Sequence, residues 1–382
     1  MGRSMRLVVL NYVFDPRIES PERLLEDYDA LTGWCRAARD AGMQVRIVQA
    51  FTRSAVLMDD GVEWVFCAAS ASRERWGRRM HTVVASLKPD VVHVNGLDAP
   101  LQMWLLRRAL PTSAAIVAQD HGGAPPRGRL KRVVKRGLMR AADGYLFTSA
   151  SLAEPWIQRG FISKDAVHEV LAASTSLRPM DQATARRVTG MVGTPALLWV
   201  ARLHPNKDPL TILDGFERVA LRLPGATLTM IYQDAELLSA VEQRLARSDV
   251  LRDRVRLVGR VPHDELAAWY SAADMFVIGS ANEVCGYAAV EACACGAIPV
   301  LTDIPSFRVM TGNGVVGHLW RRGDAESLAD ALVAASKNVP SQRARVRKHF
   351  AAHLSWSAVG QRARAVYESV VATRRGLGRH AP

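Results

Sequence analysis

Cysteine is scarce in this 382-residue sequence, and the few cysteines are not spaced as metal sites or disulfide frameworks require. The five are Cys35, Cys67, Cys285, Cys293 and Cys295. Only the last two stand close together, and no His or Cys lies at zinc-like spacing beside them. An odd, scattered set in a chain of this length is typical of free thiols in a reducing compartment. We therefore expect neither a bound metal nor a disulfide framework.

Long apolar runs and targeting signals are also missing. No segment approaches the roughly 18–20 apolar residues that a membrane span needs. The longest early run, 7–14, is interrupted by Asn11 and Tyr12 and is followed by no small-residue cleavage site. Arg6 stands where a myristoylation motif has Ser or Thr. We expect a cytoplasmic protein, with any membrane contact being peripheral and on the inner face.

Acidic residues are too few to balance the basic ones, and the formal net charge is +13. The segment 127–140 has seven basic residues and no acidic one, with Leu130, Val133, Val134 and Leu138 at helical spacing. This pattern is typical of an interfacial helix that faces anionic headgroups, and a solvated basic helix is the open alternative. The segment has no interleaved aromatics and the chain no nucleic-acid-binding motif, so we expect no nucleic-acid partner.

Short apolar runs alternate with helical patterns along most of the chain, which predicts a parallel α/β architecture. The expected strands are 6–13, 44–49, 91–94, 114–118, 144–147, 196–200, 227–231, 255–257, 275–278 and 298–301. The expected helices are 22–41, 73–87, 101–110, 130–141, 209–223, 236–247, 264–272, 287–295, 325–335 and 357–373. The polar stretch 178–192 interrupts the alternation and is interpreted as a linker. The basic stretch 343–348 is interpreted as an exposed helix face.

The most informative segment, 280–300, has the pattern of strand, short loop, helix, glycine turn and strand. Gly286 permits a close approach of the backbone, and the N–H groups of a helix that begins at Tyr287 form an anion site suited to phosphate. Glu283 lies in the loop and Glu291 lies one turn into the helix. Two carboxylates there would repel a phosphate, so we expect them to bind hydroxyls of a ribose or a sugar instead.

Two cations follow the expected strand 196–200, namely Arg202 and Lys207. Cations just past the end of a buried strand can neutralise a diphosphate leaving group as its charge develops, with no metal. Ordinary ion pairs with Asp208 and Asp214 are the alternative explanation for these two side chains.

The E-x7-E pair of Glu283 and Glu291, together with the R-x4-K pair of Arg202 and Lys207, resembles glycosyltransferase family 4, which has the GT-B fold. The resemblance is specific over roughly 196–335 and looser before it. It implies a retaining, metal-independent hexosyltransferase that moves a sugar from a nucleoside diphosphate sugar to an acceptor. A lipid-linked or cell-envelope glycan is the expected acceptor, as in polysaccharide or glycolipid biosynthesis, and no cofactor is implied.

The family's fold implies two Rossmann-like α/β domains that face each other across a cleft. The N-terminal domain, 1–180, would bind the acceptor, and the C-terminal domain, 181–355, would bind the nucleotide sugar. A crossover helix and tail, 356–382, would return to the N-terminal domain.

The same resemblance assigns roles to individual residues. Glu283 would contact donor-sugar hydroxyls and Glu291 the ribose, while Arg202 and Lys207 would hold the diphosphate. The remaining donor-binding positions are Cys285, Gly286 and Tyr287, which supply backbone N–H groups, and Arg260 and Val261, which lie against the base. His121, in Gln-Asp-His-Gly-Gly, would line the acceptor side near the anomeric carbon, and a structural loop histidine is its alternative.

The sequence departs from the family after its first strand, where the usual Gly-Gly loop is absent and 15–19 reads Asp-Pro-Arg-Ile-Glu. Two rivals therefore stay open: a sugar-phosphate synthase-type transferase with a soluble acceptor, and a non-catalytic GT-B-fold binding protein. The G-x-G-x-x-G at 312–317 continues into an expected strand and so predicts a loop rather than a dinucleotide site. Asp27-Tyr-Asp29 falls within a helical pattern, and His93 is interpreted as a hydrogen-bonded core histidine.

Overall fold

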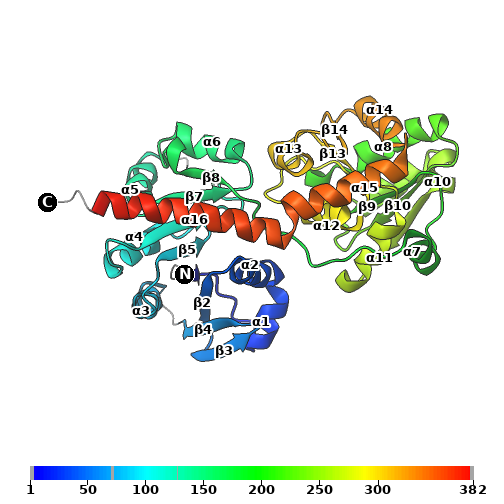
Figure 1. Cartoon of the computed structure of the whole chain (residues 1–382). Coiled ribbons are helices and arrows are strands. Elements are labelled where there is room, and N and C mark those ends of the chain that lie inside the picture. Colours follow the sequence, from blue (N-terminus) through cyan, green and yellow to red (C-terminus); the bar gives the residue numbers. More distant parts are fainter. Residues whose placement is uncertain (1–3, 70–72, 127, 379–382) are drawn as a thin grey trace. The chain divides into compact units, whose positions relative to one another are not determined.

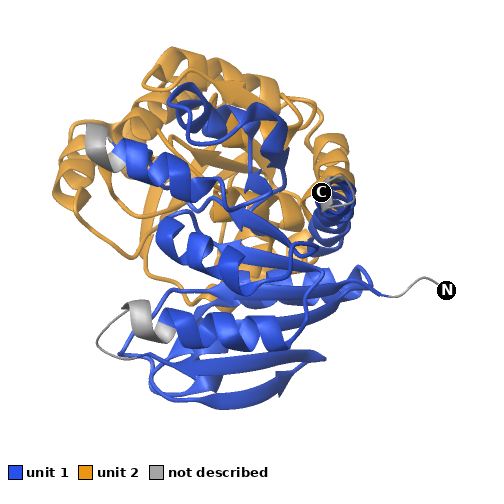
Figure 2. Cartoon of the chain, turned by 90° about the vertical axis from the view of Figure 1, so that its left-hand side faces the viewer, with its two compact units in different colours: residues 1–173, 356–382 blue, residues 174–355 orange. Residues whose placement is uncertain are grey.

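The computed structural model describes residues 4–69, 73–126 and 128–378, and the chain forms two compact units (Figure 2). Unit 1 contains 1–173 and 356–382, and unit 2 contains 174–355. The first boundary therefore lies earlier than the expected 180. Ser174 already belongs to unit 2, because its hydroxyl donates to the carbonyl of Leu354 at 2.5 Å and so connects the two ends of that unit.

Unit 1 is built on an eight-stranded sheet of order β3-β4-β2-β1-β5-β6-β7-β8. Its strands are β1 (Arg6–Asn11), β2 (Gln44–Phe51), β3 (Ala55–Asp59), β4 (Val62–Ala68), β5 (Val91–Asn95), β6 (Ala115–Gln119), β7 (Gly144–Phe147) and β8 (Val167–Glu169). All neighbours pair in parallel except β3, which runs antiparallel to β4. All five residues of β6 are buried, as is typical of parallel strands covered on both faces.

Helices of unit 1 cover this sheet, and the last helix of the chain is one of them (Figure 1). They are α1 (Pro21–Asp27), α2 (Asp29–Asp40), α3 (Arg73–Ser86), α4 (Pro100–Ala109), α5 (Arg129–Met139), α6 (Ala150–Gln158) and α16 (Trp356–Gly378), with the 3-10 helix η1 (Lys164–Ala166). Tyr367 of α16 bonds His93 of β5 at 2.7 Å, and Arg375 donates to Asp90 at 2.8 Å. The expected return of the last helix to unit 1 and the core interpretation of His93 are thus confirmed.

Unit 2 is built on a six-stranded parallel sheet of order β11-β10-β9-β12-β13-β14. Its strands are β9 (Ala196–Val200), β10 (Thr227–Ile231), β11 (Val255–Gly259), β12 (Met275–Ile278), β13 (Ile298–Thr302) and β14 (His318–Trp320). Its helices are α7 (Gln182–Thr189), α8 (Pro209–Arg222), α9 (Leu238–Ala246), α10 (Asp249–Arg254), α11 (Leu266–Ala272), α12 (Tyr287–Cys295), α13 (Pro305–Thr311), α14 (Ala325–Ala335) and α15 (Val339–His349), with η2 (Pro205–Lys207), η3 (His263–Glu265) and the π-helix η4 (Phe350–Leu354). The α/β class expected from the alternating pattern is confirmed in both units.

Several local expectations were wrong. The strands β3, β4 and β8 and the helix α6 were not expected, and the expected linker contains α7. The expected helix 22–41 is two helices that meet at Tyr28, so Asp27-Tyr-Asp29 lies at a helix break rather than inside a helix. The stretch 343–348 is helical, but Arg343 is only 6% exposed, because its guanidinium donates to backbone carbonyls beneath α15.

Each sheet reverses its strand order at one place, and ligands of open α/β sheets bind at the carboxyl ends of the strands beside such a reversal. In unit 1 the strand order reverses at β1, which lies between β2 and β5. In unit 2 it reverses at β9, which lies between β10 and β12. Within the described ranges, no helix has both the length and the apolarity to cross a bilayer.

Candidate functional site

The switch point of unit 2 gathers most of the residues expected to bind a donor. Arg202 and Lys207 follow β9, and the segment from Glu283 to Gly286 joins the neighbouring strand β12 to α12. The sheet order places the ends of β9 and β12 side by side. Residues separated by about eighty positions in the sequence therefore meet at one edge of the sheet.

Lys207 and Glu283 form an ion pair at this edge, and both side chains are mostly buried, with 15% and 13% exposed. The Glu283 carboxylate also accepts a hydrogen bond from the hydroxyl of Ser280 at 2.6 Å. The two loops are joined further by Asn206, whose amide donates to the carbonyl of Asn282 at 3.0 Å and accepts from its N–H at 3.1 Å. The loop that carries the cation is thus fixed to the loop that carries the carboxylate.

The alternative that the two cations form ordinary pairs with Asp208 and Asp214 is wrong. Asp208 is the N-cap of α8, and its carboxylate accepts from the N–H of Thr211 at 3.4 Å. Asp214 pairs with Arg244 at 2.6 Å. Arg202 is 55% exposed and lies 3.9 Å from the carboxylate of Asp234, a distance at which an exposed pair contributes little. Its guanidinium remains accessible at the edge of the sheet.

The helix α12 begins at Tyr287, as expected. Gly286 precedes it in the left-handed conformation, with φ of 66°. A Cβ atom at this position would lie 2.6 Å from the ring of Phe307, so only glycine fits between the helix start and α13. No side chain caps the helix, and its positive N-terminal end faces the same edge as Lys207.

Glu291 is 6% exposed, so it is a buried carboxylate rather than a solvated residue on the face of α12. One of its carboxylate oxygens lies 2.6 Å from Nε2 of His263, and the other accepts the hydroxyl of Tyr270 at 2.9 Å. Burial, together with the adjacent Glu291 carboxylate, raises the pKa of Tyr270 well above its usual value, so Tyr270 stays a donor. These two partners were not predicted as site residues, because nothing local in the sequence connects them to Glu291.

The other predicted donor residues lie close to the same edge. Arg260 and Val261 directly follow β11, and Arg260 is exposed. Cys285 is buried in the loop before α12, and Tyr287 is 49% exposed at its first position. The roles assigned to these residues stay predictions.

The switch point of unit 1 holds His121, which follows β6. Its Nε2 atom lies 2.5 Å from Oδ1 of Asn95, at the end of β5. The amide of Asn95 donates to Oδ1 of Asn11 at 3.2 Å, and the amide of Asn11 donates to Oε1 of Gln49 at 2.8 Å. A series of side-chain hydrogen bonds therefore runs from β2 through β1 and β5 to His121 in the loop after β6, and the acceptor-side role of His121 stays a prediction.

Charged groups surround His121. The residue is exposed at the surface, but the protein atoms around its ring partly desolvate it and lower the pKa of His121, while the carboxylate of Asp98 acts in the opposite direction. Lys135 of α5 has its ammonium 4.8 Å from the ring centre of Trp156; burial lowers the pKa of Lys135, and the charge of Asp98 opposes this. The sequence did not predict Asn95, Asp98 or Lys135 as site residues, because only the sheet order brings them to this edge.

The loop that replaces the Gly-Gly pair is fixed by a local ion pair. Arg17 donates to Asp15 at 2.7 Å, and this hydrogen bond lowers the pKa of Asp15 to about 2. Val13 and Phe14, just before it, are exposed. The part of the chain that the structure describes contains no group of three or more His, Cys, Asp or Glu residues that could hold a metal ion.

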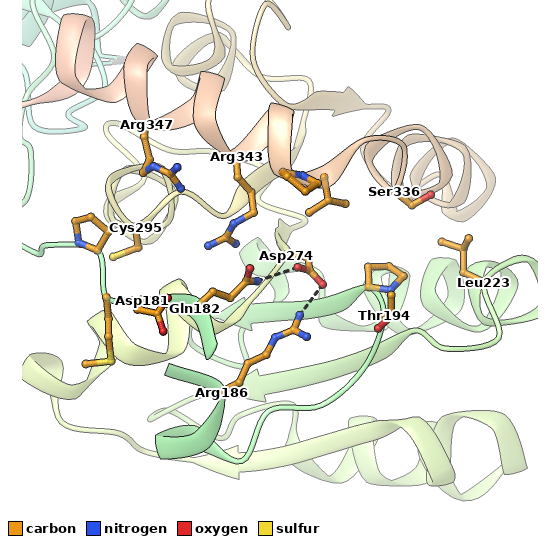
Figure 3. A pocket seen from close by; sticks show the side chains of 15 residues that line it. Asp181, Gln182, Arg186, Thr194, Leu223, Asp274, Cys295, Ser336, Arg343 and Arg347 are labelled. Atoms are coloured by element: carbon orange, nitrogen blue, oxygen red, sulfur yellow. Dashed lines mark hydrogen bonds and ion pairs between the residues drawn. The ribbon is translucent and has the colours of Figure 1, made fainter. Parts of the chain in front are cut away.

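A cavity of about 800 Å³ opens at the opposite edge of the unit 2 sheet, at the amino ends of its strands (Figure 3). Its charged side chains bind one another. Asp274 accepts from Arg186 at 2.8 Å and from Gln182 at 2.9 Å, and Arg343 points toward them from α15. The contacts of Asp274 hold α7 to the start of β12, and Arg343 holds α15 to the carbonyls of Ser271 and Ala273. These lining residues therefore connect structural elements and are not those of the switch point.

Comparison with known proteins agrees with this geometry. Residues 181–350 match the family described as "Glycosyl transferases group 1". The chain is 28% identical over 293 residues to a phosphatidyl-myo-inositol mannosyltransferase of Mycobacterium leprae, covering 74% of each chain. It is 28% identical over 279 residues to D-inositol 3-phosphate glycosyltransferase 1 of Catenulispora acidiphila, covering 69% of this chain and 65% of that one.

Solved structures show the same fold at lower identity. Sucrose-phosphate synthase from Thermosynechococcus elongatus superposes with a TM-score of 0.69 at 19% identity, covering 96% of this chain and 100% of that one. Anabaena HepE, in complex with UDP and glucose, gives a TM-score of 0.68 at 15% identity, covering 96% of this chain and 100% of that one. Residues 181–350 thus match the group 1 glycosyl transferases, the two curated relatives are glycosyltransferases, and the chain shares the GT-B fold of the solved structures.

Proposed function

We propose that the enzyme transfers a hexose from a nucleoside diphosphate sugar to a phosphorylated, lipid-linked acceptor, with retention at the anomeric carbon and without a metal. The observation that carries the donor half is the buried pair of Lys207 and Glu283 beside the start of α12. A cation and a helix N-terminus at one switch point suit a diphosphate, and a carboxylate between them suits sugar hydroxyls.

The donor's diphosphate gains negative charge as its bond to the sugar breaks. Lys207, Arg202 and the N-terminal end of α12 would stabilise that charge, because all three are in place before the reaction and need no reorganisation. Glu283, held by Lys207 and Ser280, would accept hydrogen bonds from hydroxyls of the donor sugar.

Glu291 suits the ribose of the donor. Its carboxylate is oriented by His263 and Tyr270, and a buried carboxylate held in this way can accept further hydrogen bonds from a diol. Arg260 and Val261, at the end of β11, would lie against the base.

The acceptor proposal rests on unit 1 and on the relatives. The two relatives are named for a phosphatidyl-myo-inositol and a D-inositol 3-phosphate, both of which are phosphorylated polyols. In this chain Lys135 supplies a cation near His121 and Asp98, at the carboxyl edge of the unit 1 sheet. A phosphate on the acceptor would find its counter-charge there.

The helix α5 suits a membrane surface. Val133 and Val134 are 65% and 54% exposed, Arg132 precedes them, and Arg140 is the C-cap of a helix that the sequence shows to be strongly basic. Apolar side chains among cations favour binding to anionic lipid, since the valines enter the interface and the cations meet the headgroups. Arg127, the first basic residue of the expected segment, lies outside the described residues.

A thermal-shift panel of UDP, GDP, ADP and TDP and their sugars, in EDTA, tests the donor site. At a hundred times its dissociation constant, the matching nucleotide should stabilise the fold by about 2.7 kcal/mol. We expect Arg202→Ala to abolish that shift, while Arg218→Ala retains it. Arg218 is the matched control, because its side chain is 52% exposed, close to the 55% of Arg202, but pairs with Glu326 instead. No shift with any nucleotide in EDTA would contradict the donor proposal and favour a non-catalytic protein.

Co-sedimentation with vesicles tests the membrane proposal. We expect binding to vesicles that contain an anionic phospholipid, little binding to phosphatidylcholine alone, and loss of binding at high salt. Val133→Ser with Val134→Ser should weaken binding at least about tenfold, since each exposed valine that enters an interface contributes on the order of 1.5 kcal/mol. Val188→Ser with Val192→Ser, two exposed valines of unit 2, is the control. Equal binding to neutral and anionic vesicles at low salt would rule out this role for α5.

A further inference from the structure

A chain of side-chain hydrogen bonds ends at His121, and its other end is anchored on the backbone. The amide nitrogen of Gln49 donates to the carbonyls of Val13 and Ala50 at 2.7 and 2.8 Å. The N–H of Val13 donates to Oδ1 of Asn11 at 3.2 Å. Gln49 and Asn11 are buried, with 0% and 1% exposed, so water does not compete for these contacts.

The backbone groups determine which way each amide points. A carbonyl only accepts, so Gln49 must present its nitrogen to Val13 and Ala50 and its oxygen to Asn11. Asn11 then presents its nitrogen to Gln49 and its oxygen to the N–H of Val13, which only donates. This orientation of Asn11 is thus fixed independently from both sides.

The same reasoning continues to the histidine. Asn95 meets the oxygen of Asn11, so it must donate there and turn its own oxygen toward His121. Nε2 of His121 must then carry a proton, because an oxygen and an unprotonated nitrogen would both be acceptors. Tautomers and amide orientations that are usually assigned by inspection are here imposed by three backbone groups.

We propose that a relay of three side chains holds His121 as the Nε2–H tautomer, so that the Nδ1 lone pair accepts a hydrogen bond from a substrate hydroxyl. The three side chains are those of Gln49, Asn11 and Asn95, and together they are called the His121 relay. Asn95, Asn11 and Gln49 are positioning residues in this arrangement, and they act only through His121. The inference deepens the proposed function and rests on it for the identity of the substrate.

An acceptor nitrogen requires a neutral ring. Partial desolvation lowers the pKa of His121 and so favours the neutral ring, although Asp98 opposes it and the residue is exposed at the surface. The other charged or titratable groups nearby are His93, which is buried in β5 with its pKa lowered to about 3, Asp120, which precedes His121, and Lys135, which is electrostatically coupled to Asp98. Among the described residues none bonds Nδ1 of His121, so the lone pair remains available to a ligand.

Nitrogen-15 NMR of histidine-labelled full-length protein tests the relay without any turnover. The His121 signal is assigned by its loss in His121→Gln. In the wild-type protein at pH 7.5 we expect a protonated Nε2 and an unprotonated Nδ1. In Asn95→Asp the carboxylate stabilises the imidazolium, so the pKa of His121 should rise by about 1–3 units. Asn338→Asp, the same change in unit 2, should leave it unmoved.

Two results would overturn the relay: an Nδ1–H tautomer in the wild-type protein, or a His121 pKa that does not respond to Asn95→Asp. Once the nucleotide sugar is known, the acid limb of the pH profile of kcat/KM should move upward in Asn95→Asp by the same amount as the NMR pKa. A confirmed tautomer in a protein that transfers no sugar would contradict the proposed function and leave the relay intact. Sugar transfer by a protein whose His121 carries its proton on Nδ1 would support the proposed function and contradict the relay.

Discussion

Lys207→Met should lower kcat/KM for the nucleotide sugar by about 10²–10³, the cost of removing one preorganised group that stabilises developing negative charge. Lys207 is the buried cation of the unit 2 switch point, and it lies beside the start of α12. Water cannot replace it readily, because its side chain is only 15% exposed. The measurement is the initial rate of nucleoside diphosphate release with the donor found by thermal shift.

The same change also leaves Glu283 without its cation, so lost activity could reflect an unpaired buried charge. The double variant Lys207→Met with Glu283→Gln separates the two effects. It removes both charges and keeps the hydrogen bond of Ser280 to side chain 283 available. We expect the double variant to recover the thermal stability that the single variant loses, but none of its activity. Recovery of activity in the double variant, or a loss below about tenfold in the single one, would contradict a leaving-group role for Lys207.

The donor side of this site was predictable because its signals are local. Glu283, Gly286 and Glu291 lie on one strand–loop–helix segment, and Arg202 and Lys207 lie on another. In parallel sheets such loops converge at the carboxyl edge, so their position followed from the strand pattern. The expected start of α12 at Tyr287 is confirmed, whereas the left-handed conformation of Gly286 before it was not predicted.

What sequence reasoning missed depends on contacts between distant segments. The His121 relay, Gln49, Asn11 and Asn95, comes from three strands, and His121 follows a fourth; no local pattern reveals the order of these strands. His263 and Tyr270 become partners of Glu291 only after α11 packs on α12.

The edge strand β3 escaped prediction for a different reason. Its exposed positions are apolar, with Val56 65% and Met58 62% exposed, so the usual alternation of apolar and polar residues is missing. Arg343 was misjudged because it lies in a basic run, where the charge pattern predicts a solvated face. Its burial is compensated by backbone carbonyls at the end of α11, which the sequence does not show.

Asp274→Ala should destabilise unit 2 by about 3–5 kcal/mol, the cost of breaking a buried charge network by removing one partner. The carboxylate of Asp274 is 10% exposed and accepts from Arg186, from Gln182 and from the N–H of Ala196 at 2.8 Å. Arg186, Gln182 and the N–H of Ala196 all lose this carboxylate as an acceptor, and Arg343, which points toward Asp274, loses the charge that favours its protonated form (Figure 3). Burial already lowers the pKa of Arg343 to about 10, so its charge is costly to keep.

The measurement is thermal unfolding, in which each kcal/mol shifts the Tm of a unit of this size by about 2–4 °C, so a decrease of roughly 6–20 °C is expected. The control is Asp330→Ala, which removes an exposed partner of Arg222 and should cost no more than about 1 kcal/mol. Because Asp274 lies at the amino ends of β9 and β12 and the donor residues at their carboxyl ends, the folded variant should still bind the nucleotide below its Tm. A variant as stable as the control would contradict the structural role of Asp274, and a folded variant that no longer binds nucleotide would show that Asp274 affects the donor site.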